Sequence, residues 1–113
     1  MPTVADLAAA QLAAYNAADL DAFCACYADD VTVLDAAGAV TCQGMEAFRE
    51  RYRPMFERGN FGASVSTRLH LGDHAMDDEE YWRVGPDGAR TEGRVLVRYT
   101  AHGDTIGVVQ FFR

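Results

Sequence analysis

The sequence is poor in positive charge and has no long apolar run, and each shortage excludes a class of protein. Its 113 residues carry 17 acidic and 10 basic side chains, which gives a formal net charge of −7. Nucleic-acid phosphates need a basic binding face, so we expect no nucleic-acid partner. No apolar stretch approaches the ~20 residues that cross a bilayer, so we expect no membrane association through a spanning helix.

Cysteines and leader features are also scarce. The N-terminal stretch MPTVADLAAA lacks a basic segment and is interrupted by Asp6, so we predict no secretory signal and a cytoplasmic protein. The three cysteines Cys24, Cys26 and Cys42 are an odd number. Cys24 and Cys26 would point about 200° apart on a helix, which does not suit a shared metal ion. Core thiols are the favoured interpretation, with a metal or redox role as the alternative.

The apolar residues that are present suffice for one domain spanning residues 1–113. Half of the chain is apolar, and a chain of this length can bury a core. Capping residues and apolar spacing predict three helices, from Thr3 to about Ala17, from Asp19 to about Tyr27, and over residues 45–58, where Gly59 ends the last one. Alternating or β-branched stretches predict strands over residues 31–35, 40–42, 62–71, 75–84, 90–101 and 105–113. Helices followed by an antiparallel meander predict an α+β domain.

One segment carries a resemblance to a known family. Residues 14–52 read AYNAADLDAFCACYADDVTVLDAAGAVTCQGMEAFRERY. A helix that ends in YADD, a strand VTVLD and a new helix after Gly44 resemble the opening of a SnoaL-like, ketosteroid-isomerase-like domain of the nuclear transport factor 2-like superfamily. The resemblance covers nearly the whole chain. It implies a cone-shaped α+β barrel, with three N-terminal helices packed on a strongly curved, mainly antiparallel sheet, and a conical ligand pocket between them.

The resemblance also implies an active site without metal or cofactor. In ketosteroid isomerases an aspartate after YADD is the general base, and here that position is Asp35. Tyr27 and Tyr52 match two tyrosines of the family's hydrogen-bond network. The family's oxyanion-hole aspartate and tyrosine positions are held here by Val95 and Gln11. Because loss of one such donor typically costs roughly 10²–10³ in rate, we expect no efficient steroid isomerisation.

Strand alternation extends this predicted pocket. If Val95 points inward, Gly93, Val97 and Tyr99 do too. On the neighbouring strands the resemblance puts Val108, Gln110, Phe112, Asp78, Glu80 and Trp82 inside, and Asp77, Glu79 and Tyr81 outside. Together with Phe56 these residues would give an aromatic cavity in which Asp35, Asp78 and Glu80 converge and raise one another's proton affinity. A one-residue bulge would invert this register.

Simpler interpretations stand beside these. Asp35 could terminate its strand or cap the following turn, and a charge run such as Asp77–Glu80 is usually a solvated edge. Tyr27 and Tyr52 could be core aromatics with satisfied hydroxyls. Gln110, an amide on an apolar strand face, needs partners that either a ligand or a link to Asp35 would supply. Nothing matches a Ser/His/Asp set, a phosphate loop or a zinc motif, so we predict neither a metal site nor a cofactor.

Two functions follow, from different classes. The first is a cofactor-independent isomerase- or cyclase-like enzyme that takes a small apolar, carbonyl-bearing molecule, with Asp35 as the base and Asp78 or Glu80 as the proton donor. The second is a non-catalytic dimeric binding or scaffold module of the same fold. The resemblance implies a homodimer formed through the outer sheet face around Arg94, Leu96 and Arg98, whose arginines would meet Glu79 or Asp77 of the other chain.

Overall fold

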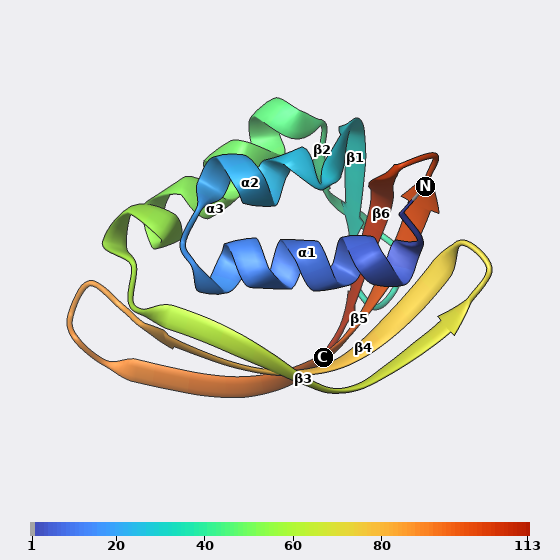
Figure 1. Cartoon of the computed structure of the whole chain (residues 1–113). Coiled ribbons are helices and arrows are strands. Elements are labelled where there is room, and N and C mark those ends of the chain that lie inside the picture. The colour runs from blue at the N-terminus through green and yellow to red at the C-terminus, as the bar shows by residue number, and fades with distance from the viewer. Residues whose placement is uncertain (1) are drawn as a thin grey trace.

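The computed structural model describes residues 2–113, and in it three helices cover the concave side of one curled sheet (Figure 1). The elements are α1 (Val4–Asn16), α2 (Leu20–Ala25), β1 (Tyr27–Leu34), β2 (Val40–Gln43), α3 (Met45–Arg58), β3 (Phe61–Leu71), β4 (His74–Val84), β5 (Arg90–His102) and β6 (Thr105–Phe112). The predicted α+β class is confirmed. The sheet curls but does not close into a complete barrel, since its two outermost strands remain unpaired with each other.

Local sequence signals place the helix ends. At the start of α1, Asp6 N–H donates to the Thr3 hydroxyl (3.1 Å) and Thr3 N–H donates to the Asp6 carboxylate (2.9 Å), which is a capping box. Asp19 caps α2 by accepting from the Ala22 N–H. Gly59 follows α3 with φ of 64°, in the left-handed region that favours glycine. The second helix is shorter than predicted, because Tyr27 begins β1 rather than ending α2.

The strand order is β2-β1-β6-β5-β4-β3. Neighbouring strands run antiparallel except for β1 and β6, which are parallel. The last four strands form the predicted meander, and β1 pairs with β6, the last strand of that meander. Edge positions therefore fall to β2 and β3, and the long central strands lie beneath the helices.

A β-bulge interrupts β3. Val65 pairs with Glu79 and Thr67 pairs with Asp78, so Ser66 is the extra residue. The bulge reverses which side chains face inward beyond Ser66. The alternation within the predicted strand 62–71 puts Leu69 and Leu71 on one face with Val65, and this expectation is wrong, because the two leucines are 65% and 84% exposed.

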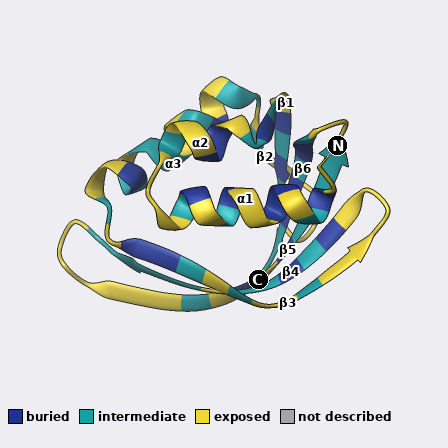
Figure 2. Cartoon of the chain, viewed as in Figure 1, coloured by how far each residue is buried: buried dark blue, intermediate teal, exposed yellow. Residues whose placement is uncertain are grey.

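Buried segments occur in all three helices and in the sheet (Figure 2). Aromatic side chains from the three helices form the centre of the core. Phe23 of α2 stacks on Phe48 of α3 with ring centroids 5.7 Å apart, and Phe56 packs against Phe61 at 5.0 Å. Cys24 is buried among these residues as a free thiol. Among the described residues, no helix has the length and apolar character needed to cross a bilayer.

Candidate functional site

A cavity of about 280 Å³ lies between the helices and the concave face of the sheet. Its lining combines every tyrosine of the chain with a group of arginines and a single carboxyl group. These residues are Tyr15, Tyr27, Tyr52, Tyr81 and Tyr99, then Arg51, Arg58, Arg83 and Arg113, and finally Glu79. This volume is just below the roughly 300–1,000 Å³ typical of ligand pockets.

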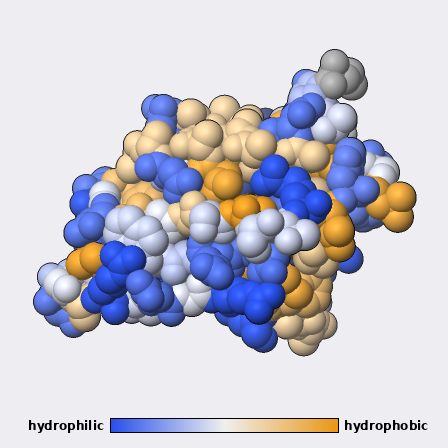
Figure 3. All heavy atoms as spheres, turned by 60° about the horizontal axis from the view of Figure 1, so that its bottom comes forward, coloured by the Kyte–Doolittle hydropathy of each residue, from blue (hydrophilic) through white to orange (hydrophobic). Residues whose placement is uncertain are grey.

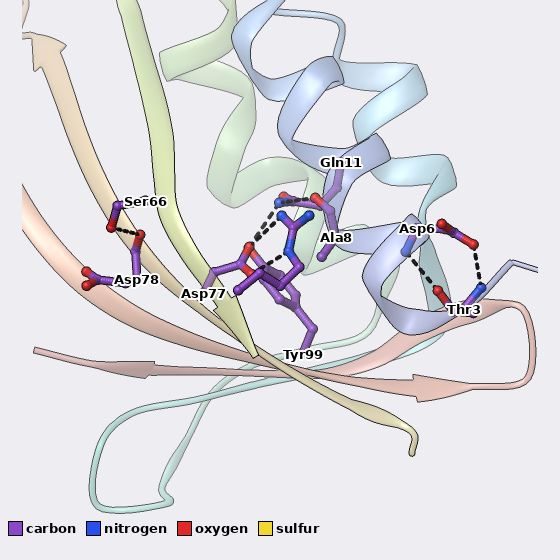
Figure 4. A network of polar contacts seen from close by, with 9 residues as sticks. Thr3, Asp6, Ala8, Gln11, Ser66, Asp77, Asp78 and Tyr99 are labelled. Atoms are coloured by element: carbon purple, nitrogen blue, oxygen red, sulfur yellow. Dashed lines mark hydrogen bonds and ion pairs between the residues drawn. The ribbon is translucent and has the colours of Figure 1, made fainter. Parts of the chain in front are cut away.

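Gln11 organises the inner wall of this cavity from α1. Its Nε2 donates to the Tyr99 hydroxyl (3.0 Å) and to the Ala8 carbonyl (3.0 Å), and its Oε1 accepts from the Tyr27 hydroxyl (2.9 Å). Gln11 is only 4% exposed, so these bonds satisfy an amide that would otherwise be costly to bury. Figure 4 shows Gln11 reaching from the helix to Tyr99 on the sheet. The network fixes two tyrosine hydroxyls from β1 and β5 in one place.

Glu79 is the carboxyl group of the cavity. Burial, the largest cause, and the nearby Asp77 carboxylate together raise its pKa from 4.5 to about 7, against the opposing effect of Arg113 and Arg83. Glu79 therefore holds and releases a proton near neutral pH. A carboxyl group with such a pKa in a ligand-sized cavity is suited to general acid–base work.

The tyrosines around Glu79 are held in their protonated form. Burial raises the pKa of Tyr52 to about 12 and raises the pKa values of Tyr27 and Tyr99 well above their usual range, with a further contribution from the Glu79 charge. Protonated hydroxyls are hydrogen-bond donors at neutral pH. Because Tyr27 already donates its proton to Gln11, the hydroxyls of Tyr52 and Tyr99 are the donors that the cavity offers beside its one carboxyl group.

Arginine side chains alternate with aromatic rings along one side of the cavity. The Arg51 guanidinium lies 6.0 Å from the Phe111 ring centroid, and Arg113 lies 5.5 Å from the same ring. Arg113 is also 5.8 Å from the Tyr81 ring, whose other neighbour is Arg83 at 4.7 Å. We call this set, Arg51–Phe111–Arg113–Tyr81–Arg83, the arginine ladder. Its members come from α3, β4 and the end of β6.

The predicted register of β4 is inverted. Glu79 pairs with Val95 and Tyr81 with Gly93, and residues opposite each other in an antiparallel pair share a face. Val95 does line the cavity, so Glu79 and Tyr81 do as well. The predicted pocket residues Asp78, Glu80 and Trp82 consequently lie on the outer face. Figure 4 shows Asp77 pointing toward Tyr99, whereas Asp78 points away.

The same inversion affects β6. Tyr99 pairs with Val109 and Val97 with Phe111, so the cavity receives Val109 and Phe111 rather than Val108, Gln110 and Phe112. Gln110 instead donates from its Nε2 to the Asp35 backbone carbonyl (3.1 Å). One of the two partners anticipated for this amide, a link to Asp35, is therefore found.

Asp35 lies outside the main cavity. Its Oδ1 accepts from the backbone N–H groups of Ala37 (3.0 Å) and Ala39 (2.9 Å), which closes the turn between β1 and β2. Its carboxylate borders a neighbouring surface pocket that shares Arg51, Phe111 and Arg113 with the cavity. Tyr27 and Tyr52 line the cavity itself, and Phe56 packs against Tyr52 in the core. The structure thus separates Asp35 from the two tyrosines expected to orient it.

Two of the charged residues assigned to a dimer interface, Asp77 and Arg94, have partners within the chain. Asp77 is fully buried and receives two bonds from Arg68, at 2.6 and 2.9 Å. Arg94 pairs with Asp78 on the outer face (2.7 Å). The expected ion pairs from Arg94 or Arg98 to Glu79 or Asp77 of another chain are therefore wrong, because both acids face the interior.

Sequence reasoning missed Glu79 and the arginine ladder. The acidic run from Asp77 to Glu80 was read one residue out of register. Counting equal steps from the predicted hairpin turn at residues 85–88 would set Glu79 opposite Arg94. In the structure Val84 pairs with Arg90, so the loop has one more residue and Glu79 lies opposite Val95. Within residues 2–113, no cluster of three or more His, Cys, Asp or Glu side chains has the arrangement to hold a metal ion.

Comparisons with known proteins agree with this architecture. A crystal structure of an uncharacterised cystatin-fold protein from Novosphingobium aromaticivorans is 26% identical, covers 100% of both chains and superposes with a TM-score of 0.89. The ketosteroid-isomerase-like protein of Catenulispora acidiphila, in complex with trimethylamine, is 20% identical over 96% of this chain and 85% of its own, with a TM-score of 0.75. Rv0760c of Mycobacterium tuberculosis, in complex with estradiol-17β-hemisuccinate, is 14% identical over 96% of this chain and 91% of its own, with a TM-score of 0.83.

Sequence comparison assigns the family. No curated protein sequence matches this chain. The model of the SnoaL-like domain matches residues 8–112, almost the entire length. With its helices on a curled, open, mostly antiparallel sheet, the chain has the nuclear transport factor 2-like fold and belongs to the SnoaL-like domain family.

Proposed function

We propose that this protein binds a small, largely apolar, carbonyl-bearing molecule in its tyrosine-lined cavity and exchanges a proton with it through Glu79. The observation that carries the proposal is a cavity whose single carboxyl group has a pKa of about 7 and is surrounded by tyrosine donors. A base beside a carbonyl removes a proton from the adjacent carbon, and hydroxyl donors stabilise the enolate that forms. Isomerisation and cyclisation both begin with this step.

The family resemblance supports a different base, Asp35. Its position after YADD favours that role, whereas the two backbone bonds to its Oδ1 and its place outside the cavity favour a structural one. Glu79 has the raised pKa and the direct access to the cavity that the reaction needs. We therefore assign proton transfer to Glu79 and keep Asp35 as the alternative that the experiment tests.

The test measures proton exchange rather than a full reaction. Aromatic and cyclic ketones are first screened for ligands that raise the melting temperature, since binding to the folded state stabilises it. Each hit is then incubated with protein in D₂O, and deuterium next to the carbonyl is measured by mass spectrometry. Wild type and Asp35→Asn should exchange, and Glu79→Gln should not. Exchange lost in Asp35→Asn but kept in Glu79→Gln would return the role to Asp35.

A non-catalytic binding module is the second candidate. By the family resemblance, Val95 and Gln11 occupy the positions of the two oxyanion donors of the isomerases. The Gln11 amide is already hydrogen-bonded to the hydroxyls of Tyr27 and Tyr99. Under this reading Glu79 only hydrogen-bonds the ligand. Ketones that bind tightly but show no deuterium uptake above a protein-free control would favour the binding module.

We also propose a homodimer through the outer sheet face. In Figure 3 this underside of the molecule mixes hydrophilic and hydrophobic residues. Leu96 is 41% exposed there, and the nearby Arg98 Nε is buried without a hydrogen-bond partner among residues 2–113. Light scattering behind a sizing column should give twice the chain mass for wild type and the monomer mass for Leu96→Asp. A monomeric wild type would contradict the dimer.

A further inference from the structure

The arginines of this acidic protein fall into two groups. Of its ten arginines, Arg49, Arg53, Arg68, Arg90 and Arg94 pair with acidic side chains. Four of the other five line the cavity, and none of those four forms an ion pair with a carboxylate within residues 2–113. In a chain of net charge −7, uncompensated positive charge is thus concentrated at the one cavity that also holds aromatic rings and a proton-exchanging carboxyl group.

Three of these four arginines, Arg51, Arg83 and Arg113, belong to the arginine ladder, where aromatic rings position the guanidinium groups without neutralising their charge. A guanidinium stacked on an aromatic ring is attracted to the ring face, and its N–H groups remain directed outward around its edge. Arg113 donates one of these N–H groups to the Tyr81 hydroxyl (3.2 Å), which leaves the others available. The Arg83 Nε is buried and has no hydrogen-bond partner among the described residues. An unpaired buried donor on a cation is costly unless an anion completes the site.

We infer that the ligand of this cavity is an aromatic acid of one or two rings, whose carboxylate is bound by Arg83 and Arg113 beside Glu79. The inference rests on the proposed function and adds an aromatic ring and a carboxylate to the carbonyl-bearing substrate that it names. The planar fork of arginine matches a carboxylate, and such charge-assisted bonds are about twice as strong as neutral ones. The tyrosine rings and the volume of about 280 Å³ set the size and aromatic character of the remaining body.

The test compares acids with neutral molecules of the same shape. Benzoate and naphthoate are titrated by calorimetry beside benzamide and naphthamide, at neutral pH. Each acid should bind wild type about tenfold more tightly than its amide, and Arg83→Gln or Arg113→Gln should remove about tenfold from the acid alone. Arg90→Gln is the matched control, because Arg90 also lies over an aromatic ring, Trp82 at 4.6 Å, but on the outer face. It should leave both affinities unchanged.

A second readout needs no variant. Raising NaCl from about 20 to about 300 mM should weaken acid binding several-fold and leave amide binding nearly constant, because salt screens the ion pair. Equal binding of acid and amide, without an effect of salt or of the arginine substitutions, would overturn the inference and leave the proposed function standing. If neither acids nor amides bind, the inference falls, and the separate screen of aromatic and cyclic ketones decides whether the ligand-binding proposal stands.

Discussion

The ring of Tyr81 lies against Gly93 on the neighbouring strand, so closely that a Cβ on Gly93 would meet the Tyr81 Cζ and Oη at 2.5 Å. The two residues are cross-strand partners on the cavity face. Any larger residue at 93 would force the ring away. Because Tyr81 sits between Arg83 and Arg113, the absence of one methyl group on β5 determines where two cations of the arginine ladder are held.

Replacing Gly93 with alanine should therefore destabilise the protein by roughly 1–3 kcal/mol, as overpacking typically does. Urea unfolding measures this free energy. Gly85→Ala is the control, since its Cβ would lie 3.2 Å from the Asp87 carboxylate, a milder contact than the 2.5 Å at Gly93, and its φ is not in the left-handed region. We expect that variant to be destabilised clearly less than Gly93→Ala. Equal costs at the two positions would contradict the close approach of Tyr81.

The raised pKa of Glu79 predicts a particular pH dependence of stability. A carboxyl group whose pKa rises from 4.5 to about 7 on folding favours the neutral form. Its stabilising contribution is complete below about pH 4.5 and is lost as the pH rises through about 7, which amounts to roughly 3 kcal/mol. Glu79→Gln cannot ionise at this position and should not lose stability in this way. The difference in free energy of unfolding between this variant and wild type should therefore shift in favour of the variant as the pH rises from about 4.5 to about 7. The exposed outer-face variant Glu80→Gln should instead follow the wild-type curve.

Gln11 should contribute more to the free energy of unfolding than an exposed polar residue does, because its amide is buried and fully hydrogen-bonded. Gln11→Leu would leave the hydroxyls of Tyr27 and Tyr99 without their amide partner and should lower the free energy of unfolding by roughly 1–3 kcal/mol. Adding Tyr27→Phe and Tyr99→Phe to the same protein should recover part of that loss. Gln43→Leu, which removes an exposed amide, is the control and should change stability little. A triple variant no more stable than Gln11→Leu would argue against the network.

The Arg68–Asp77 pair predicts a strong asymmetry between single and double substitutions. Asp77 is 0% exposed, so Arg68→Met leaves a buried carboxylate unpaired and should cost roughly 3–5 kcal/mol. Substituting both residues, as Arg68→Met with Asp77→Leu, should be far less destabilising. Thermal unfolding of the two single variants and the double variant gives the coupling energy directly. Additive effects would show that the ion pair is not formed.

The role of Asp35 in the β1–β2 turn can be separated from any chemical role. Asparagine retains an oxygen for the N–H groups of Ala37 and Ala39, so Asp35→Asn should change stability by less than about 0.5 kcal/mol. Asp35→Ala loses both bonds and should cost roughly 1–3 kcal/mol. Chemical denaturation distinguishes the two variants. Similar losses in both would mean that the negative charge, rather than the turn geometry, matters for folding.

Local signals explain why the elements were predictable from the sequence. Thr3 with Asp6, Asp19 and Gly59 act within a few residues of the chain, and each is found at the helix end that it predicted. The spacing of apolar residues likewise placed α3 at its observed bounds. Such features do not depend on distant parts of the fold, so a single sequence is sufficient to read them.

The cavity lining depended on pairing between distant strands and was largely mispredicted. The face of Glu79 follows from its partner Val95, and the face of Phe111 follows from Val97. The family resemblance gave a face for each strand separately, without the pairing between strands. The residues predicted to face the cavity from β4 and β6 are therefore those of the opposite face. The bulge at Ser66 had no sequence signal that we identified, since serine there is compatible with a regular strand.

The bulge in β3 also limits association of two molecules through the edges of their sheets. β3 is an edge strand of 11 residues that ends in the exposed Leu69 and Leu71. The Asn16 side chain binds the backbone N–H and C=O groups of Ala63 on its outer edge, but it does not cover the rest of this long strand. A straight strand of that length would be a template for open-ended stacking. The extra residue at Ser66 divides the strand into two short segments with different twist, so an incoming chain finds no long register to match.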